Sequence, residues 1–391
     1  MARVVILGSY AESLVQFRGH FIRRLLREGH QVVAAAPGPC EAVASTLSGW
    51  GARFVEVPMD RQGMHPTRDL KTLKALHDLF RDESPEVFVG YTIKPVVYGL
   101  LAAWLADVPS RYALITGLGS AFSGGADGTR QALLQTLASL LYGISLRTSQ
   151  RVIFQNTDDA YLFCARRLVG GPEDVAIVNG SGVDLQHYRP VPLPRQTTFL
   201  LIGRLLRDKG IREYVQAARR IKANHPEVVF RLAGWVDPES PAAIDIDEVE
   251  RWHDEGTIEF LGRLEDVRQA LGKASVFVLP SYREGTPRTV LEAMAMGRPV
   301  VTSDAPGCRH TVENGRNGFL VPVGDVEALV RALTHFVDAR SLIRDMGSAS
   351  RELVADRFDV RDVNENLLDI LDLRTRPVPP PVPREARKRS G

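Results

Sequence analysis

The chain has 391 residues, of which 44% are hydrophobic and 25% charged, a balance that suits a folded protein with two ordinary cores. Its formal net charge of +2 gives no general basis for nucleic-acid binding, so we expect no nucleic-acid partner. The 3 cysteines, Cys40, Cys164 and Cys308, are widely separated and form no metal-ligand pair, which favours structural thiols in a reducing compartment.

The N-terminal half alternates short apolar runs with helical patterns, which predicts an α/β fold with a parallel sheet and right-handed crossovers. Its first segment, 1–8, resembles a strand and lacks the features of a signal peptide, so we expect a cytoplasmic protein. The strands expected in this half are 4–7, 32–36, 53–57, 87–89, 112–115, 151–154 and 176–178.

A helical pattern over 20–27 mixes apolar residues with arginines and follows Phe17 and Arg18. Such a mixture can lie against anionic lipid, and any amphipathic helix of an α/β domain shows the same pattern, so both interpretations stay open. The best apolar candidate for a membrane span, 132–146, is interrupted by Gln135, Ser139 and Gly143. We therefore expect no membrane span, and any membrane contact to be peripheral, on the cytoplasmic face of the inner membrane.

A proline-rich stretch over 188–195 predicts a stiff hinge between two halves of similar architecture. The strands expected after it are 199–202, 229–233, 258–261, 276–279, 300–302 and 318–321. The predicted organisation is a first domain over 1–187, a linker over 188–196, a second domain over 197–358, a helix crossing back to the first domain over 359–373, and a disordered basic tail over 374–391.

Two glutamates follow the expected strand 276–279. Glu284 lies on a turn that contains Gly285, and Glu292 lies on a helix predicted to begin at Pro287 with Thr286 as its N-cap. A carboxylate at such a place can accept hydrogen bonds from two hydroxyls, as in a ribose. The alternative is that Glu292 pairs with Arg288 four residues earlier and that Glu284 is an exposed loop acid.

Two cations follow the expected strand 199–202. Arg204 and Lys209 lie in the loop between Gly203 and Gly210, before the next helical pattern. Cations beside a helix start can hold a diphosphate, with each charge-assisted hydrogen bond contributing roughly 1.5 to 3 kcal/mol. Loop cations are also commonly solvated, but two such loops in one chain favour a binding site.

Asp245 and Asp247 form an Asp-x-Asp pattern, by which some other folds hold a divalent metal ion. On a helix these two side chains would point to different sides, so an acidic helix start is the better interpretation. Asp158 and Asp159 are also expected to begin a helix. We therefore expect no metal site and no cofactor.

These motifs together resemble those of retaining glycosyltransferases of the GT-B fold, glycosyltransferase family 4, which have two Rossmann-like domains facing across a cleft. The resemblance rests on 203–210, on the spacing of Glu284 and Glu292, and on 315–325. The stretches 90–99 and 115–122 are similar to bacterial enzymes that extend polyprenyl-diphosphate-linked glycans, including N-acetylgalactosaminyltransferases.

The resemblance implies that Arg204 and Lys209 hold the donor diphosphate and act in catalysis with Glu284, which contacts the transferred sugar, while Glu292 holds the ribose. The donor-binding residues it implies are Gly203, Arg204, Lys209, Arg263, Glu284, Gly285, Thr286, Pro287, Arg288, Thr289 and Glu292. Acceptor-binding residues are expected at Phe17, Arg18, Lys94, Gly117 and Gly119. For Lys94 the alternative is a solvated cation before Pro95, and for the two glycines a tight turn.

The chain departs from the family at one place. Many members carry a histidine in a crevice loop where this sequence has Thr116 and Gly117, so a histidine-assisted reaction is in doubt. We expect a hexose or N-acetylhexosamine to pass from a nucleotide sugar, with UDP favoured over GDP, to a lipid-linked or soluble glycan, with the departing phosphate accepting the proton. A nonhydrolysing sugar-nucleotide epimerase and a catalytically silent sugar-nucleotide-binding protein remain as alternatives.

Overall fold

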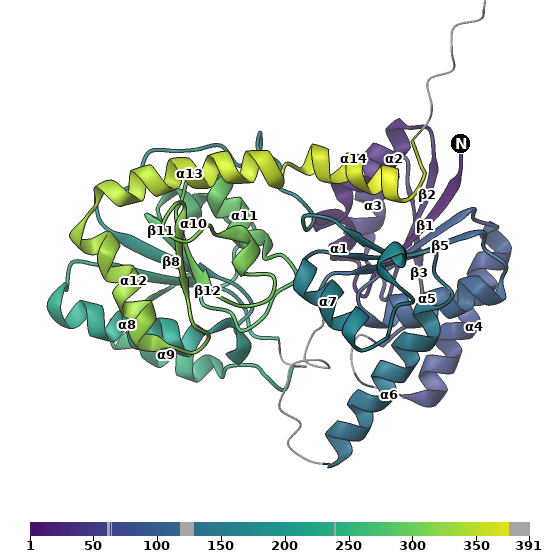
Figure 1. Cartoon of the computed structure of the whole chain (residues 1–391), viewed down its shortest axis with the longest axis horizontal. Coiled ribbons are helices and arrows are strands. Elements are labelled where there is room, and N and C mark those ends of the chain that lie inside the picture. The colour runs from purple at the N-terminus through teal and green to yellow at the C-terminus, as the bar shows by residue number, and fades with distance from the viewer. Residues whose placement is uncertain (61–62, 64, 118–128, 238–239, 375–391) are drawn as a thin grey trace, which may run out of the picture.

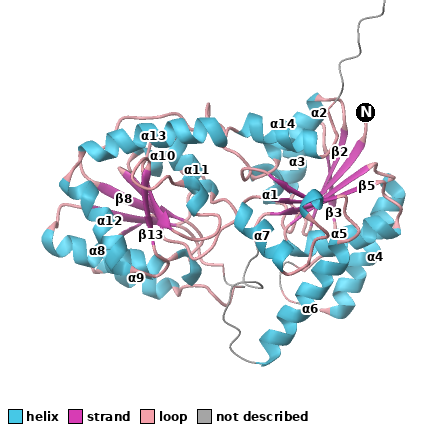
Figure 2. Ribbon diagram, viewed as in Figure 1, coloured by secondary structure: helices cyan, strands magenta, loops and turns pink. Residues whose placement is uncertain are grey.

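The computed structural model describes residues 1–60, 63, 65–117, 129–237 and 240–374, which form two α/β lobes (Figure 1). The first lobe contains a seven-stranded sheet of order β3-β2-β1-β4-β5-β6-β7, and the second a six-stranded sheet of order β10-β9-β8-β11-β12-β13. All the strand pairs are parallel, with helices covering both faces of each sheet (Figure 2). The predicted fold of two doubly wound α/β units is confirmed.

Every strand expected from the apolar runs is present, with ends that differ by at most two residues. The strands are β1 Arg3–Leu7, β2 Gln31–Ala36, β3 Arg53–Glu56, β4 Val87–Tyr91, β5 Ser110–Ile115, β6 Arg151–Phe154, β7 Val175–Ile177, β8 Thr198–Ile202, β9 Val229–Ala233, β10 Glu259–Phe260, β11 Val276–Leu279, β12 Val300–Ser303 and β13 Gly318–Val321.

The helices connect successive strands. They are α1 Glu12–Gln16, α2 Gly19–Arg27, α3 Glu41–Trp50, α4 Pro66–Glu83, α5 Ile93–Leu105, α6 Thr129–Leu146, α7 Thr157–Ala165, α8 Ile211–Asn224, α9 Ile246–Asp254, α10 Arg268–Gly272, α11 Arg288–Ala295, α12 Val326–Asp338, α13 Ser341–Arg357 and α14 Val360–Ile370, with short 3₁₀ turns at Pro172–Asp174, Arg207–Lys209 and Arg309–Thr311. None of these described helices combines the length and the apolarity needed to cross a membrane.

The apolar alternation along the strands builds the core of the first lobe. In β1, Val5 and Leu7 face one side of the sheet and Val4 and Ile6 the other, because successive strand residues point to opposite faces. Both sets are fully buried, so this strand occupies the middle of the lobe.

The C-terminal helix α14 returns to the first lobe. Val363, Leu367 and Leu368 are buried in the same apolar cluster as Val4 and Ile6 of β1. Figure 1 shows α13 and α14 running one after the other along one side of both lobes, so the chain joins them at this place as well as in the linker. The domain boundaries given above stay predictions, and residues 375–391 of the predicted tail lie outside the described residues.

Candidate functional site

The two loops that carry the predicted donor residues lie at the point where the strand order of the second sheet reverses. β8 and β11 are neighbours there, and 203–210 follows the first while 281–288 follows the second. Ligands of open parallel sheets bind outside the carboxyl ends of the strands at such a point. The loops are joined directly, because the Ser281 hydroxyl and the Tyr282 N–H both donate to the Asp208 carbonyl, at 3.1 and 2.8 Å.

Gly210 makes this close approach of the two loops possible. Its φ of +69° lies in the left-handed region, and a Cβ atom there would lie only 2.1 Å from the Pro280 carbonyl oxygen. Any larger residue would force the loops apart. Gly203, at the other end of the first loop, donates its N–H to the Ala233 carbonyl at 3.1 Å and so ties that loop to the end of β9.

Both predicted diphosphate cations have carboxylate partners. Lys209 forms an ion pair with Glu284, and each of these side chains is 15% exposed. Arg204 lies 3.3 Å from the Asp237 carboxylate and is more open, at 40% exposure. The alternative of solvated loop cations is therefore wrong for Lys209. A diphosphate bound here would compete with Glu284 and Asp237 for the same two cations.

Glu292 is buried on α11 and receives two donors at one oxygen. The Arg288 Nε atom and the Tyr188 hydroxyl each lie 2.8 Å from Glu292 Oε1. Burial raises the pKa of the Glu292 carboxyl, and the positive charge of Arg288 and the Tyr188 hydrogen bond act against that rise. The predicted alternative, pairing with Arg288, is present, and it leaves Oε2 for another donor.

Tyr188 is a site residue that the sequence reasoning missed. The residue lies at the start of the proline-rich stretch, 104 positions before Glu292, where no local spacing connects the two. Its ring is buried and packs against the core of the second lobe. The one available signal was a tyrosine among prolines, which does not specify a partner.

The predicted start of α11 is wrong by one residue. The helix begins at Arg288, and Pro287 precedes it with an extended backbone, at ψ 110°. Thr286 does not cap the helix, because its hydroxyl donates to the Gln155 carbonyl of the first lobe at 2.9 Å. The Thr289 hydroxyl donates to the Ile202 carbonyl at 3.4 Å, which ties the first turn to the end of β8.

The donor loop 281–288 is held by the first lobe. Asn156, which caps α7, donates its side-chain amide to the Gly285 carbonyl at 2.8 Å. A Cβ atom on Gly285 would lie 2.1 Å from the Thr116 carbonyl oxygen, so the two lobes meet at this glycine. Arg283 completes the contact through an ion pair with Asp159, whose carboxyl is almost fully buried.

The acidic start of α7 therefore does more than begin a helix. Asp158 accepts hydrogen bonds from Arg309 Nη1 at 3.2 Å and His310 Nε2 at 2.9 Å, both in the second lobe. Burial raises the pKa of the neighbouring Asp159 carboxyl, and the ion pair with Arg283 counteracts this. No local pattern could predict these contacts, because each joins residues more than a hundred positions apart.

The place where many relatives carry a histidine borders the same loop. Gly117 has φ +138°, and a Cβ atom added to it would lie 3.5 Å from the Gly285 backbone nitrogen. Thr116 and Gly117 thus present backbone and a small side chain to the donor loop. Gly119, also predicted at the acceptor side, lies outside the described residues.

Lys94 differs from both interpretations offered by the sequence. It is buried at the start of α5, with its ammonium 2.8 Å from the buried Asp69 carboxylate. The other Asp69 oxygen accepts the His65 N–H at 3.0 Å, and the Tyr98 hydroxyl also bonds to this carboxylate. A solvated cation is wrong, and contact with an acceptor phosphate would require this closed cluster to open.

The helix α2 resolves the choice left open for the segment 20–27. Phe21, Ile22 and Leu25 are buried in the apolar cluster of the first lobe, so these side chains are unavailable for lipid and that interpretation is wrong for them. Just before the helix, the ring of Phe17 lies 5.3 Å beneath the Arg288 guanidinium. Phe17 thus contacts the predicted donor side of the molecule.

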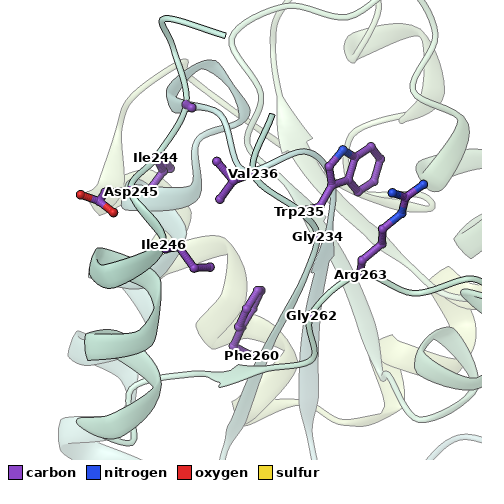
Figure 3. A pocket seen from close by; sticks show the side chains of 10 residues that line it. Gly234, Trp235, Val236, Ile244, Asp245, Ile246, Phe260, Gly262 and Arg263 are labelled. Atoms are coloured by element: carbon purple, nitrogen blue, oxygen red, sulfur yellow. The ribbon is translucent and has the colours of Figure 1, made fainter. Parts of the chain in front are cut away.

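A pocket of about 760 Å³ lies at the ends of β9 and β10 and includes Arg263 (Figure 3). The Arg263 guanidinium lies 5.2 Å from the centre of the Trp235 ring, and Figure 3 shows these two side chains next to each other. Phe260 and Ile246 provide apolar lining on the other side. Asp245, at the rim, is the N-cap of α9 and accepts the Asp247 N–H at 3.1 Å, as expected of an acidic helix start.

Two family models match the chain, one over each lobe. A model described as "Glycosyl transferase 4-like domain" matches residues 15–180, and one described as "Glycosyl transferases group 1" matches residues 196–339. Together they cover most of the chain and both predicted substrate sides.

Curated relatives match three quarters or more of the chain. The chain is 24% identical over 378 residues to an N,N'-diacetylbacillosaminyl-diphospho-undecaprenol alpha-1,3-N-acetylgalactosaminyltransferase of Campylobacter jejuni, covering 91% of this chain and 97% of that protein. It is 26% identical over 307 residues to a UDP-Gal:alpha-D-GlcNAc-diphosphoundecaprenol alpha-1,3-galactosyltransferase of Escherichia coli, covering 75% and 76%.

Solved structures agree in fold. Sucrose-phosphate synthase of Thermosynechococcus elongatus has a TM-score of 0.77 at 18% identity, covering 95% of this chain and 98% of that one. HepE of Anabaena, in complex with UDP and glucose, has a TM-score of 0.74 at 18% identity, covering 95% and 100%.

Proposed function

This chain belongs to the glycosyltransferases of the GT-B fold, and from that premise we propose that it moves a hexose or N-acetylhexosamine from a UDP-sugar to a polyprenyl-diphosphate-linked glycan. Two of its relatives are named for diphosphoundecaprenol-linked acceptors, and both match most of the chain. The product would be a lipid-linked glycan longer by one sugar, as in bacterial polysaccharide or glycoconjugate assembly.

One observation carries the donor assignment: cations and carboxylates from separate loops converge where the strand order of the second sheet reverses. Lys209 and Glu284 are in direct contact, and Glu292 lies on the helix that follows Glu284. We assign the diphosphate to Arg204 and Lys209, the transferred sugar to Glu284 and the ribose to Glu292. A helix dipole assists, because α8 begins directly after Lys209 and directs free N–H groups to this edge.

The Trp235 and Arg263 pair is the proposed contact of the nucleoside. The pair follows β9 and β10 at the same edge of the sheet as the diphosphate loops. An aromatic face and a planar guanidinium offer a flat surface on which a base can stack. In this arrangement the nucleotide extends along the carboxyl edge from β11 towards β10.

The proposed chemistry is transfer on one face of the sugar. As the bond from C1 to the diphosphate breaks, negative charge grows on the phosphate, and Arg204 and Lys209 stabilise it. The departing phosphate accepts the proton of the acceptor hydroxyl. A double displacement would need a free carboxylate beneath the sugar. The first-lobe carboxylate that reaches the donor loop, Asp159, is paired with Arg283, and its neighbour Asp158 is paired with Arg309 of the second lobe.

We also propose that the protein works in the cytoplasm, at the inner face of the membrane that holds its acceptor. All 3 cysteines are free thiols, which suits a reducing compartment. The protein then meets the membrane through the lipid part of its acceptor.

The test is a mass-spectrometric transfer assay on the purified full chain. UDP- and GDP-sugars are offered with a short polyprenyl-diphosphate monosaccharide, with and without EDTA. A product heavier by one hexose or N-acetylhexosamine, formed from a UDP-sugar in the presence of EDTA, is the expected result. Conversion of the donor without acceptor would instead identify an epimerase or a hydrolase, and binding without turnover a silent binding protein.

A further inference from the structure

Arg18 is a buried cation that has no hydrogen-bond or ion-pair partner among the described residues. It lies between α1 and α2 and is 3% exposed, with its guanidinium 5.1 Å from the centre of the Tyr91 ring. Within the described residues its guanidinium makes no hydrogen bond or ion pair, and its Nε atom is fully enclosed without an acceptor. Burial lowers the pKa of Arg18 to about 10, so it still carries its charge at neutral pH.

The structure contains a direct contrast in Arg298, which is also buried, at 1% exposure. Its guanidinium donates to the carbonyl oxygens of Leu271, Val191 and Gly272 at 3.1 to 3.2 Å. Arg298 thus donates a hydrogen bond from each of its three guanidinium nitrogens, as buried polar groups normally do. Arg18 has only the face of an aromatic ring, which compensates for part of the lost hydration.

The groups around Arg18 favour an anion. Arg288 of the second lobe is near enough for its charge to contribute to the lowered pKa of Arg18, and it stacks on the adjacent Phe17. Tyr91 and Tyr10, at the ends of β4 and β1, are the other groups that act on that pKa, and none of the three is a carboxylate. Arg288 is itself paired with Glu292, so Arg18 is the cation at this place that has no carboxylate partner among the described residues.

We propose that Arg18 binds a diphosphate group of a substrate that enters between the lobes. A guanidinium offers the planar, paired donors that phosphate oxygens prefer. This inference rests on the proposed function, which supplies two such groups, one in the UDP-sugar and one in the lipid-linked acceptor. Arg288, which pairs with Glu292 and donates to the Gln16 carbonyl of the first lobe, adds positive charge near Arg18 from the second lobe.

The experiment compares Arg18→Gln, Arg18→Lys and wild type in the full chain. The matched control is Arg23→Gln, because Arg23 also stacks on an aromatic ring, Trp50 at 5.0 Å, but on the outer part of α2. The acceptors are N-acetylglucosamine linked to farnesyl through a diphosphate and the same sugar linked through an ether without phosphate. UDP binding is measured by calorimetry, and melting temperatures verify folding.

We expect Arg18→Gln to lower kcat/KM by roughly 10- to 150-fold with the diphosphate acceptor, the loss of one charge-assisted contact, and Arg23→Gln to leave it unchanged. If the acceptor supplies the anion, the loss vanishes with the ether acceptor and UDP affinity is unaffected. If the donor supplies it, UDP binds more weakly and the loss persists with both acceptors. Arg18→Lys, which keeps the charge without the paired donors, should fall between Arg18→Gln and wild type.

Equal kcat/KM in a folded Arg18→Gln variant and an active wild type would overturn the inference and leave the proposed function intact. An inactive wild type would instead count against the proposed function. If wild type is inactive, or if Arg18→Gln melts well below the control, the affinity for inorganic pyrophosphate is compared between wild type and Arg18→Lys instead. Equal affinity of those two proteins for pyrophosphate would overturn the inference.

Discussion

The two lobes hold similar polar side chains in opposite ways. In the second lobe, Lys209 and Glu284 meet across two loops and keep part of their surface open. In the first lobe, Lys94 and Asp69 form a cluster that further hydrogen bonds close, while Arg18 is enclosed without a hydrogen-bond or ion-pair partner among the described residues. A cation on a loop at a sheet edge is therefore not evidence of a ligand site by itself. What distinguishes Lys209, Lys94 and Arg18 is how far other groups of the protein already pair with and hydrogen-bond the positive charge.

The largest effect is expected from replacing Lys94, the closed pair of this comparison. Replacement by Met leaves the Asp69 carboxylate buried without its cation, which should lower the free energy of unfolding by about 3 to 5 kcal/mol. Chemical denaturation measures this loss. Lys74→Met is the control, because its pair with Asp78 is exposed and should change stability little. A stable Lys94→Met protein that binds its acceptor poorly would restore the acceptor role predicted from the sequence.

Replacing Lys209 tests the role of the Lys209–Glu284 pair in the second lobe. Lys209→Met removes the proposed stabilisation of the leaving diphosphate and should reduce kcat by about 100- to 1000-fold, or roughly 2.7 to 4 kcal/mol. The measurement is turnover at saturating donor and acceptor. The control is Lys222→Met on α8, whose ammonium donates to the Gly256 carbonyl at 2.6 Å away from the two loops. Comparable turnover in both variants would remove Lys209 from the site.

Glu292 should separate binding from stability. Glu292→Gln keeps an acceptor for Tyr188 but removes the charge, so UDP affinity should fall roughly 10- to 100-fold, about 1.4 to 2.8 kcal/mol. Calorimetry with UDP measures this change. Glu227→Gln, at an exposed position, is the control. Unchanged UDP affinity in Glu292→Gln would show that the ribose is bound elsewhere.

The same variant makes the pH dependence testable. The pKa of Glu292 is raised from its ordinary 4.5 in the folded protein, so the folded state binds this proton more tightly than the unfolded state. Stability should therefore fall as the pH rises above 4.5 through the raised pKa, and then level off. The unfolding free energy of Glu292→Gln minus that of wild type should therefore increase over that pH range, because glutamine does not titrate. A difference that shrinks with rising pH would contradict the assigned direction.

The smallest effect is expected at Tyr188. Tyr188→Phe removes one hydrogen bond to Glu292 and should weaken UDP binding by roughly 2- to 10-fold, about 0.5 to 1.5 kcal/mol. Tyr214→Phe is the matched control, because its hydroxyl also bonds inside the second lobe, to the Arg231 carbonyl at 3.1 Å. If both variants bind UDP as wild type does, Tyr188 only packs and does not position the glutamate.

Local patterns predicted most of the fold. The apolar runs placed all the described strands, because a strand buried on both faces by covering helices must be apolar over its whole length. α11 ends at Ala295, two residues before Gly297, whose φ of +73° cannot continue a right-handed helix. The predicted N-cap at Thr286 is wrong because the Thr286 hydroxyl donates a hydrogen bond to the first lobe instead of bonding to the end of its own helix.

The sequence by itself determined the two sheets, the loops at their edges and the residue types on them, because these depend on periodicity and on residues a few positions apart. Only the tertiary structure decided the partners: Tyr188 for Glu292, Asp69 for Lys94, and for Arg18 the Tyr91 ring without a hydrogen bond to any described residue. Each of these outcomes joins distant segments, and the energy of a buried charge depends on everything packed around it. Whether a lysine or an arginine is available to bind a substrate is therefore decided by the tertiary structure.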